Sequence, residues 1–418
     1  MPVISSPLAQ NLGLPHERAW AIRPGSVFLP GGKIERGLDV VIQRDVVVGV
    51  VPQGSHEIPA EDIVEALGST LLPGLIDSHV HLTFSADSHV VENLLAESVP
   101  NQLTRAVGNA QLALSRGVTT AIDCGGQTEI CIALRDGIAA GRLTGPRLLV
   151  SGSPITTSAG HCYWLGGVAD SREEVVQLLR SHVTHGVDFI KVMLTGGNLT
   201  VESSPSRLQY SSAVLAVIAA ECDRLGKALV VHAHSLEAVE AAASVGARVI
   251  VHGTCSGEGG EIGLRDSTVA LLLAGGSFVD PTLMVGREKG AGENSGASGR
   301  RYEQRRAMIP LFKIMRDAGV ELLAGSDAGV PGVAHGSVSG SIVALHKEVG
   351  FSIEAALLAG TMVPARAFGL SHLVGSIGAG LQADLLLTSG LVEDDLEAVL
   401  RPRIVWKAGR VVSTEGLA

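Results

Sequence analysis

LLPGLIDSHVHL, at residues 71–82, is the stretch of sequence that best indicates the fold. Its first six residues are apolar or small, which predicts a short buried strand. In an extended chain alternate side chains share a face, so Asp77, His79 and His81 project together from the end of this strand. Two histidines in this spacing suit a metal ion. They are equally explained as hydrogen-bonded core or surface histidines, so other segments must decide.

Length and composition limit the class of protein. The 418 residues are 46% hydrophobic and 18% charged, which is typical of a globular chain with a large core. A net charge of −10 without a basic block argues against nucleic acid and favours a small-molecule partner. No signal peptide or membrane span is recognisable, so we expect a cytoplasmic protein with no membrane contact. The five scattered cysteines predict reduced thiols, and we expect a homo-oligomer.

The two ends of the chain show the same sequence pattern. Short β-type runs broken by Gly, Pro and Asp occupy residues 18–70 and again 376–414. This pattern predicts one small β-sandwich domain built from both chain ends. The predicted division is 1–70 and 371–418 for the two parts of that domain, with 71–370 between them.

The middle of the chain alternates strand-like and helix-like segments. One helix is predicted to open at Ser171, with Glu174 in the capping-box position. Eight strands alternating with helices predict an α/β fold, a (β/α)8 TIM-type barrel with its site at the carboxyl ends of the strands. The predicted strands are 71–76, 117–126, 147–155, 188–194, 228–234, 248–253, 277–283 and 321–329.

Polar side chains recur at those strand ends. Lys191 lies inside the fourth strand, where an unpaired ammonium is costly to bury. His232 and His234 end the fifth strand, His252 the sixth and Asp327 the eighth. Singly, each has a simple explanation as an ion-pair partner, a core imidazole or a helix cap. Together with the first-strand histidines they surround one axial point, which favours a metal centre.

Nine short motifs stand out along the chain, namely LLPGLIDSHVHL, GVTTAIDCGG, DFIKVMLTGG, VVHAHS, VIVHGT, GSDAGV, the later HGS, TMVPARAFGL and GSIGAGLQADLLL. In combination they resemble the amidohydrolase superfamily, and are most similar to its imidazolonepropionase-like and Xaa-Pro dipeptidase-like branch. The resemblance implies a distorted barrel, a split β domain and a hydrolase with a one- or two-metal centre, most simply two Zn²⁺. It implies that His79, His81 and Asp327 hold one ion, that His232 and His252 hold the second, and that Lys191, as a carbamate formed with CO₂, bridges them.

The expected chemistry follows from these residue types. A divalent ion brings a bound water towards neutral pKa, and Asp327 can take its proton as general base and return it to a leaving nitrogen as general acid. His161 or His335 is a candidate for stabilising the oxyanion, although each is equally a loop histidine.

Substrate recognition is less strongly indicated by the sequence. Tyr163, Trp164 and His234 are candidate substrate-binding residues, and the aromatic pair equally suits packing of its loop. Residues 286–306 are polar and glycine-rich, which suggests either a solvated loop or a flap whose arginine meets a substrate carboxylate.

Two classes of function therefore remain. The first is hydrolysis of an amide or related C–N bond in an N-acyl amino acid, dipeptide, cyclic amide or carbamate, with a deaminase or an imidazolonepropionase-like cyclic hydrolase as the enzymatic alternative. The second is a non-catalytic assembly protein on an amidohydrolase scaffold. We expect such a protein to have lost ligands that this chain retains.

Overall fold

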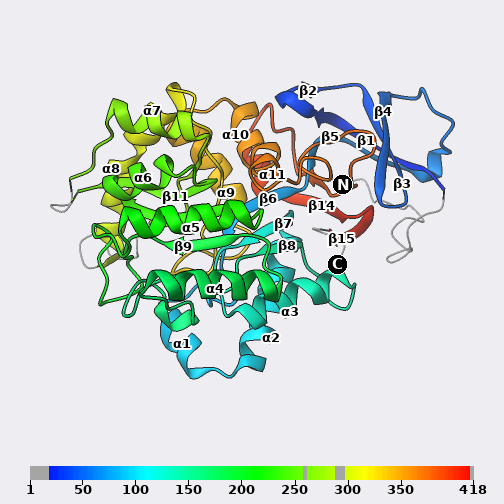
Figure 1. Ribbon diagram of the computed structural model, residues 1–418. Helices are drawn as coiled ribbons and strands as arrows, with labels where there is room; N and C mark the ends of the chain where they lie inside the picture. The colour runs from blue at the N-terminus through cyan, green and yellow to red at the C-terminus, as the bar shows by residue number, and fades with distance from the viewer. Residues whose placement is uncertain (1–17, 258–260, 288–296, 415–418) are drawn as a thin grey trace.

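The computed structural model describes residues 18–257, 261–287 and 297–414. Figure 1 shows two parts, a mixed β-sheet that contains both the first and the last strands, and a set of parallel strands surrounded by helices. The strands of the mixed sheet, called the terminal sheet below, are β1 (Trp20–Phe28), β2 (Ile34–Glu35), β3 (Leu38–Gln43), β4 (Val46–Pro52), β5 (Ile63–Pro73), β13 (Leu385–Thr388), β14 (Pro402–Lys407) and β15 (Arg410–Thr414).

The terminal sheet is curled over its own core. Its strand order is β15-β14-β13-β5-β1-β3-β4, with β2 paired to β1. β1 and β14 are three strand spacings apart in this order, roughly 14 Å in a flat sheet. The rings of Trp20 and Trp406, on those two strands, nevertheless lie 6.2 Å apart. Hydrogen bonding thus gives one curled mixed sheet where two stacked sheets of a sandwich were predicted. The predicted domain boundaries stay a prediction.

The parallel strands form a ring. A three-stranded sheet (β6-β7-β8) and a four-stranded sheet (β12-β11-β10-β9) are joined by single bridges. Ile155 bridges to Val192 between the two sheets, and residues 321–329 bridge to β12 and to β6 and so complete the ring. The arrangement is TIM-barrel-like. Its regular strands are β6 (Leu75–Val80), β7 (Val118–Asp123), β8 (Arg147–Val150), β9 (Ile190–Met193), β10 (Leu229–Ser235), β11 (Val249–Ser256) and β12 (Phe278–Asp280).

Two of the predicted barrel strands differ from the structure. Leu71–Pro73 belongs to β5 and pairs with Leu385–Leu387 of β13, so the first ring strand begins only at Leu75. Gly74 separates the two strands, and a Cβ there would lie 2.1 Å from Oγ1 of Thr119. The eighth segment, 321–329, is held by isolated bridges rather than by a regular ladder.

Helices cover the outside of the ring (Figure 1). The predicted capping box at the start of α4 is confirmed, because Ser171 and Glu174 bond each other's backbone N–H. Within the described ranges no helix is long and apolar enough to cross a membrane. The helices are α1 (Val90–Ala96), α2 (Val99–Ser115), α3 (Thr128–Ala139), α4 (Arg172–His185), α5 (Ser212–Arg224), α6 (Leu236–Ser244), α7 (Asp266–Gly275), α8 (Ala297–Asp317), α9 (Val338–Ala344), α10 (Ile353–Ala359) and α11 (Met362–Ala367).

The predicted flap at 286–306 is corrected in part. Residues 297–306 belong to α8, while 288–296 lie outside the described residues. Arg305 is buried, donates to the Leu283 carbonyl at 2.8 Å and pairs with Glu348 at 2.7 Å. This arginine therefore fixes α8 to the ring and is not free to meet a substrate carboxylate.

Candidate active site

His79 on β6 and His81 just after it meet Asp327 at the carboxyl end of the ring. Asp327 Oδ1 lies 3.3 Å from His81 Nε2 and 3.6 Å from His79 Nε2. The Nδ1 atom of His81 is 2.9 Å from the Gly125 carbonyl. Because a carbonyl only accepts, Nδ1 carries a hydrogen, and Nε2 is the ring atom that faces Asp327. The three side chains are buried and close enough to share one metal ion.

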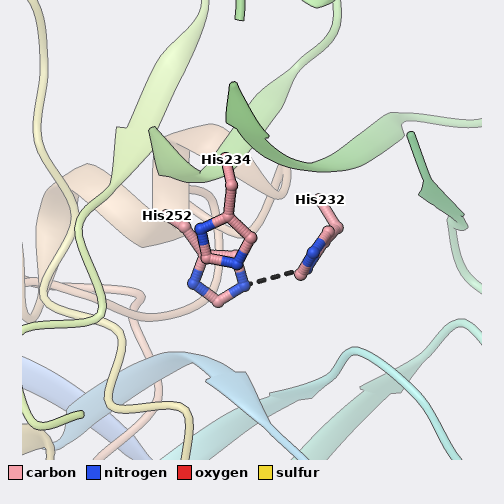
Figure 2. Close-up of side chains that lie close together, drawn as sticks. All are labelled: His232, His234 and His252. Carbon is pink, nitrogen blue, oxygen red and sulfur yellow. Dashed lines mark hydrogen bonds between the residues drawn. The ribbon is translucent and has the colours of Figure 1, made fainter. Parts of the chain in front are cut away.

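A second cluster comes from β10 and β11. Figure 2 shows a ring nitrogen of His252 facing one of His232, with the His234 ring stacked over His252, and the three are close enough to share an ion. The centroids of the His79 and His252 rings are 5.6 Å apart, so the two clusters are adjacent. His234 was predicted as a substrate-binding residue, but the structure groups it with the two predicted ligands. Alternation along β10 explains this, because residues two apart share a face.

The side-chain nitrogens of Lys191 and His79 are buried at the site. The Nζ atom of Lys191 and both ring nitrogens of His79 have no hydrogen-bond partner among the described residues. Unpaired buried polar atoms are costly, so their persistence at one point indicates a group that completes the site. Ring nitrogens, a carboxylate and an amine together suit a divalent ion with an anion. The residues present therefore fit a metal centre.

Burial governs the charge of the imidazoles. Desolvation lowers the pKa of His161 to about 3 and that of His234 to about 4. Desolvation also lowers the pKa values of His79, His232 and His252 well below the usual range, and the neighbouring Lys191 adds to this. These rings are neutral at pH 7, which is the form that binds metal.

The backbone is strained at three site residues. His252, Thr282 and Asp327 have φ values of 70°, 48° and 60°, which non-glycine residues rarely adopt. The strained conformation of Asp327 is held by its neighbour Ser326, whose N–H and hydroxyl donate to Asp77 at 3.0 and 2.6 Å. Such strain is common where a side chain must be aimed at a ligand.

Asp77 and Asp280 are buried carboxyls beneath the site that the sequence reasoning did not assign. Burial raises the pKa of Asp77 to about 7 and that of Asp280 to about 6. Asp280 accepts from the Ser78 hydroxyl at 2.6 Å. The signal available in the sequence was their position, since Asp77 directly follows the predicted strand 71–76 and Asp280 lies in the predicted strand 277–283.

The cavity at the end of the ring encloses about 640 Å³, part of it open to solvent. His161 lines it, with its ring centroid 4.7 Å from that of His232. The apolar wall was not predicted. Besides the clustered residues the lining contains Phe84, Cys162, Met193, Asn198, Leu199, Val285, Val330 and Pro331.

Three predicted site residues do not line this cavity. His335 is buried behind Phe84 and donates from Nε2 to the Phe84 carbonyl at 3.2 Å. Cys162, with φ of 57°, begins the short 3-10 turn Tyr163–Leu165. That turn leaves Tyr163 39% exposed and packs Trp164 against the core, so Cys162 faces the cavity and the two aromatics do not.

Comparison with known proteins decides the class. A model described as the amidohydrolase family matches residues 70–412. The chain belongs to the amidohydrolase family. This amidohydrolase is accordingly a hydrolase that acts on carbon–nitrogen bonds, in a family that generally uses divalent metals. The alternative of a non-catalytic assembly protein is not supported.

Individual relatives of this amidohydrolase are distant in sequence. Ochratoxinase of Aspergillus niger is 23% identical over 402 residues, which cover 87% of this chain and 78% of that protein. A solved Xaa-Pro dipeptidase with bound methionine is 25% identical, with a TM-score of 0.84 over 94% of this chain and 99% of the other. Molinate hydrolase, 24% identical with a TM-score of 0.80 over 94% of both chains, supports the fold alone.

Proposed function

We propose that this amidohydrolase cleaves an amide or related C–N bond of a small molecule, such as an N-acyl amino acid, dipeptide, cyclic amide or carbamate, at a binuclear metal centre. One observation carries the proposal. Two groups of buried ligating side chains, His79 with His81 and Asp327, and His232 with His252, face each other beside Lys191, whose Nζ has no hydrogen-bond partner in the described chain.

The proposed metal ligands are those five residues and Lys191. Two Zn²⁺ ions suit neutral imidazoles and hard oxygens, and Lys191 would bridge them as a carbamate. When bound, divalent ions bring water towards a neutral pKa and polarise a carbonyl. Two cations in one site need an anion between them, and a carboxylated lysine has the length to supply it from β9.

Asp327 is the proposed proton carrier. Its Oδ1 atom faces His79 and His81, which leaves Oδ2 to receive a proton from the attacking water and return it to the leaving nitrogen. Asp327 lines the cavity, so this exchange takes place where a substrate can reach it.

His161 is the proposed oxyanion donor. Its Nδ1 is 3.1 Å from Thr200 Oγ1, and this oxygen accepts from the Cys162 N–H at 3.0 Å. The Thr200 hydroxyl can donate to Nδ1, and the neutral ring then carries its hydrogen on Nε2. That hydrogen is available to a carbonyl oxygen that gains charge.

The cavity wall favours a substrate with an apolar portion. Phe84, Leu199, Val285 and Val330 line it together with the polar cluster. An apolar acyl or aryl group next to the scissile bond would gain about 25 cal/mol for each Å² that it buries there. His234 is retained as a proposed contact to the polar end of the substrate.

The proposal is tested with protein stripped of metal and reloaded with Zn²⁺. It is assayed against N-acyl amino acids, dipeptides, lactams and carbamates, each with apolar and polar side groups. We expect turnover of at least one class by the reloaded protein and none by the stripped protein. A chain that holds two Zn²⁺ and hydrolyses no C–N bond in the panel would disprove the proposed function.

The lysine bridge is tested separately. Lys191→Ala is expected to lose one metal ion and most of the activity, and a short carboxylic acid added to the buffer should restore part of both. Intact mass under non-denaturing conditions should show one added CO₂ in the wild type. Wild-type protein with one ion and an unmodified lysine would contradict the bridge.

A further inference from the structure

His252 is hydrogen-bonded on both sides of its ring. Its Nδ1 lies 2.9 Å from the hydroxyl oxygen of Thr282, and its Nε2 lies 2.9 Å from Nδ1 of His232 (Figure 2). The other nitrogen of His232, Nε2, lies 3.0 Å from the Gly196 carbonyl. Four groups from four segments of the ring therefore form one chain of hydrogen bonds.

The donor in each of these hydrogen bonds can be deduced by starting from the Gly196 carbonyl. A carbonyl only accepts, so Nε2 of His232 carries a hydrogen. The ring is neutral because it is buried among other imidazoles, and its Nδ1 is therefore bare. Nδ1 must accept from Nε2 of His252, and that ring, also neutral, has a bare Nδ1. Without metal, the Thr282 hydroxyl is consequently the donor to His252.

A metal ion requires the opposite hydrogen position on His252. The atoms that face each other in the cluster are His232 Nδ1 and His252 Nε2. His232 already presents a lone pair there, but His252 presents its hydrogen. To ligate through Nε2, His252 must carry its hydrogen on Nδ1, where the partner must now accept. A hydroxyl can do both, whereas a carboxylate or carbonyl only accepts and an N–H only donates.

We propose that Thr282 is a positioning residue that stabilises both tautomers of His252, donating to Nδ1 in the metal-free protein and accepting from it when an ion is bound. The inference rests on the metal centre of the proposed function. It assigns Thr282 no contact with metal or substrate. Its effect is to let His252 exchange a hydrogen-bonded resting state for a ligating state without leaving a buried ring nitrogen unpaired.

The surroundings of Thr282 hold its hydroxyl in place. Thr282 is β-branched and has φ of 48°, a conformation that needs support. Its N–H donates to Asp280 Oδ1 at 3.1 Å, and Asp280 Oδ2 accepts from Ser78 at 2.6 Å. A Cβ at Gly325 would lie 1.9 Å from Asp280 Oδ2, so the glycine leaves room for the carboxylate. β12 and β6 thus clamp the turn that carries Thr282.

The test compares Zn²⁺ binding, without substrate, by stripped wild type and by Thr282→Val, Thr282→Ser and Thr388→Val. Valine keeps the branched shape and removes the hydroxyl, whereas serine keeps the hydroxyl. Thr388→Val is the matched control, since its hydroxyl is buried in the terminal sheet and donates to the Gly390 carbonyl at 2.7 Å. Affinity is measured by competition with a chelating dye, and melting of each stripped protein is recorded beside it.

We expect Thr282→Val to bind one of the two ions about 10- to 100-fold more weakly, which is the usual cost of losing a partner behind a metal ligand. Thr282→Ser should stay near wild type, and Thr388→Val should lower the melting temperature without changing affinity. Equal Zn²⁺ affinity in Thr282→Val and wild type, or equal loss in the serine variant, would overturn the proposal.

A second measurement uses the wild type, so it does not depend on a variant that folds. In ¹⁵N-histidine-labelled protein, we expect the hydrogen of His252 to be on Nε2 without metal and on Nδ1 after Zn²⁺ is added. A hydrogen that stays on one nitrogen in both states would overturn the proposal. Zn²⁺ binding with this exchange but without hydrolysis of any substrate would instead contradict only the proposed function.

Discussion

The terminal sheet and the carboxyl end of the ring both bury charged groups, but they treat them differently. In the terminal sheet, Asp39 is fully buried and accepts from Arg23 at 3.0 and 2.9 Å, from the Gly54 N–H at 3.0 Å and from His56 at 2.8 Å. In the ring, Lys191 Nζ and the two ring nitrogens of His79 have no hydrogen-bond partner within the described ranges. A satisfied network stabilises a fold, whereas an unsatisfied one is held ready for a ligand.

Backbone strain separates the two regions in the same way. In the terminal sheet, the positive φ values of Arg44 and Ala408 occur in the turns between β3 and β4 and between β14 and β15, where hairpin geometry requires them. In the ring, His252 and Asp327 have positive φ values and are themselves proposed ligands. Strain there serves to aim a side chain, so the comparison predicts different consequences of mutation.

The largest effect is expected from removal of the chain from residue 376 onwards. This deletion takes away β13, so β5 loses its antiparallel partner and exposes Leu71 and Leu72. We expect insoluble protein, measured as the soluble fraction after expression. A shorter deletion from Arg410 removes only the edge strand β15 and should stay soluble. Equal melting of the long deletion and the full chain would show that the sheet does not depend on its last strands.

Next is Asp327→Asn, which tests whether the ring residue serves chemistry more than stability. An amide can still ligate weakly but cannot carry a proton, so kcat should fall about 100-fold or more. The melting temperature of the stripped variant should stay close to that of the wild type. Retention of more than about a tenth of kcat, a loss of only ~1.4 kcal/mol, would remove Asp327 from its proposed role.

Asp39→Asn is the converse test in the terminal sheet. Loss of a buried acceptor for Arg23 should lower the free energy of unfolding by about 1–3 kcal/mol, with kcat of the folded fraction unchanged. Burial alone would raise the pKa of Asp39, but hydrogen bonds from Arg23, Gly54 and His56 lower it below the usual value. The stabilisation is therefore present above about pH 4 and is lost as pH falls through the lower folded pKa. Urea unfolding of wild type and Asp39→Asn at pH 7 and pH 3 measures both effects. If the two proteins differ in free energy of unfolding by the same amount at both pH values, Asp39 is not the source of the pH dependence.

The last prediction concerns the acid response of the metal-free ring. The unfolded imidazole has a pKa of about 6.5, whereas burial holds that of His161 at about 3 and that of His234 at about 4. Below about pH 6.5 the unfolded chain binds more protons, so stability should fall by roughly 1.4 kcal/mol per pH unit for each such group. Urea unfolding of stripped protein between pH 7.5 and 4.5 measures this slope. A slope that His161→Gln leaves unchanged would exclude His161 as a source.

The sequence could predict which side chains lie at the carboxyl ends of the ring strands. Parallel strands fix which end carries the ligands, and this brought His79, His81, Lys191 and His252 to one point. The support beneath the site was not predictable in this way. Thr282 contacts His252 only because a strained turn redirects its hydroxyl, and no periodic pattern encodes such a turn.

Local backbone geometry decided two of the open questions. Tyr163 and Trp164 were candidates either for the cavity or for packing of their loop. Cys162, in the left-handed region, lines the cavity itself, while Trp164 packs against the core. Residues 297–306 were expected to be loop-like because of their polarity, yet they form the start of α8. In both cases a local backbone geometry outweighed the composition of the segment.

The junction between β5 and β6 has a consequence for synthesis on the ribosome. Only Gly74 separates the strand that pairs with β13 from the strand that carries His79. β5 is synthesised early in translation. Its partner Leu385–Leu387 on β13 is synthesised only after most of the ring. During translation this edge of β5 is unpaired and open to other strands, so a chaperone that covers exposed edges would act longest at this point.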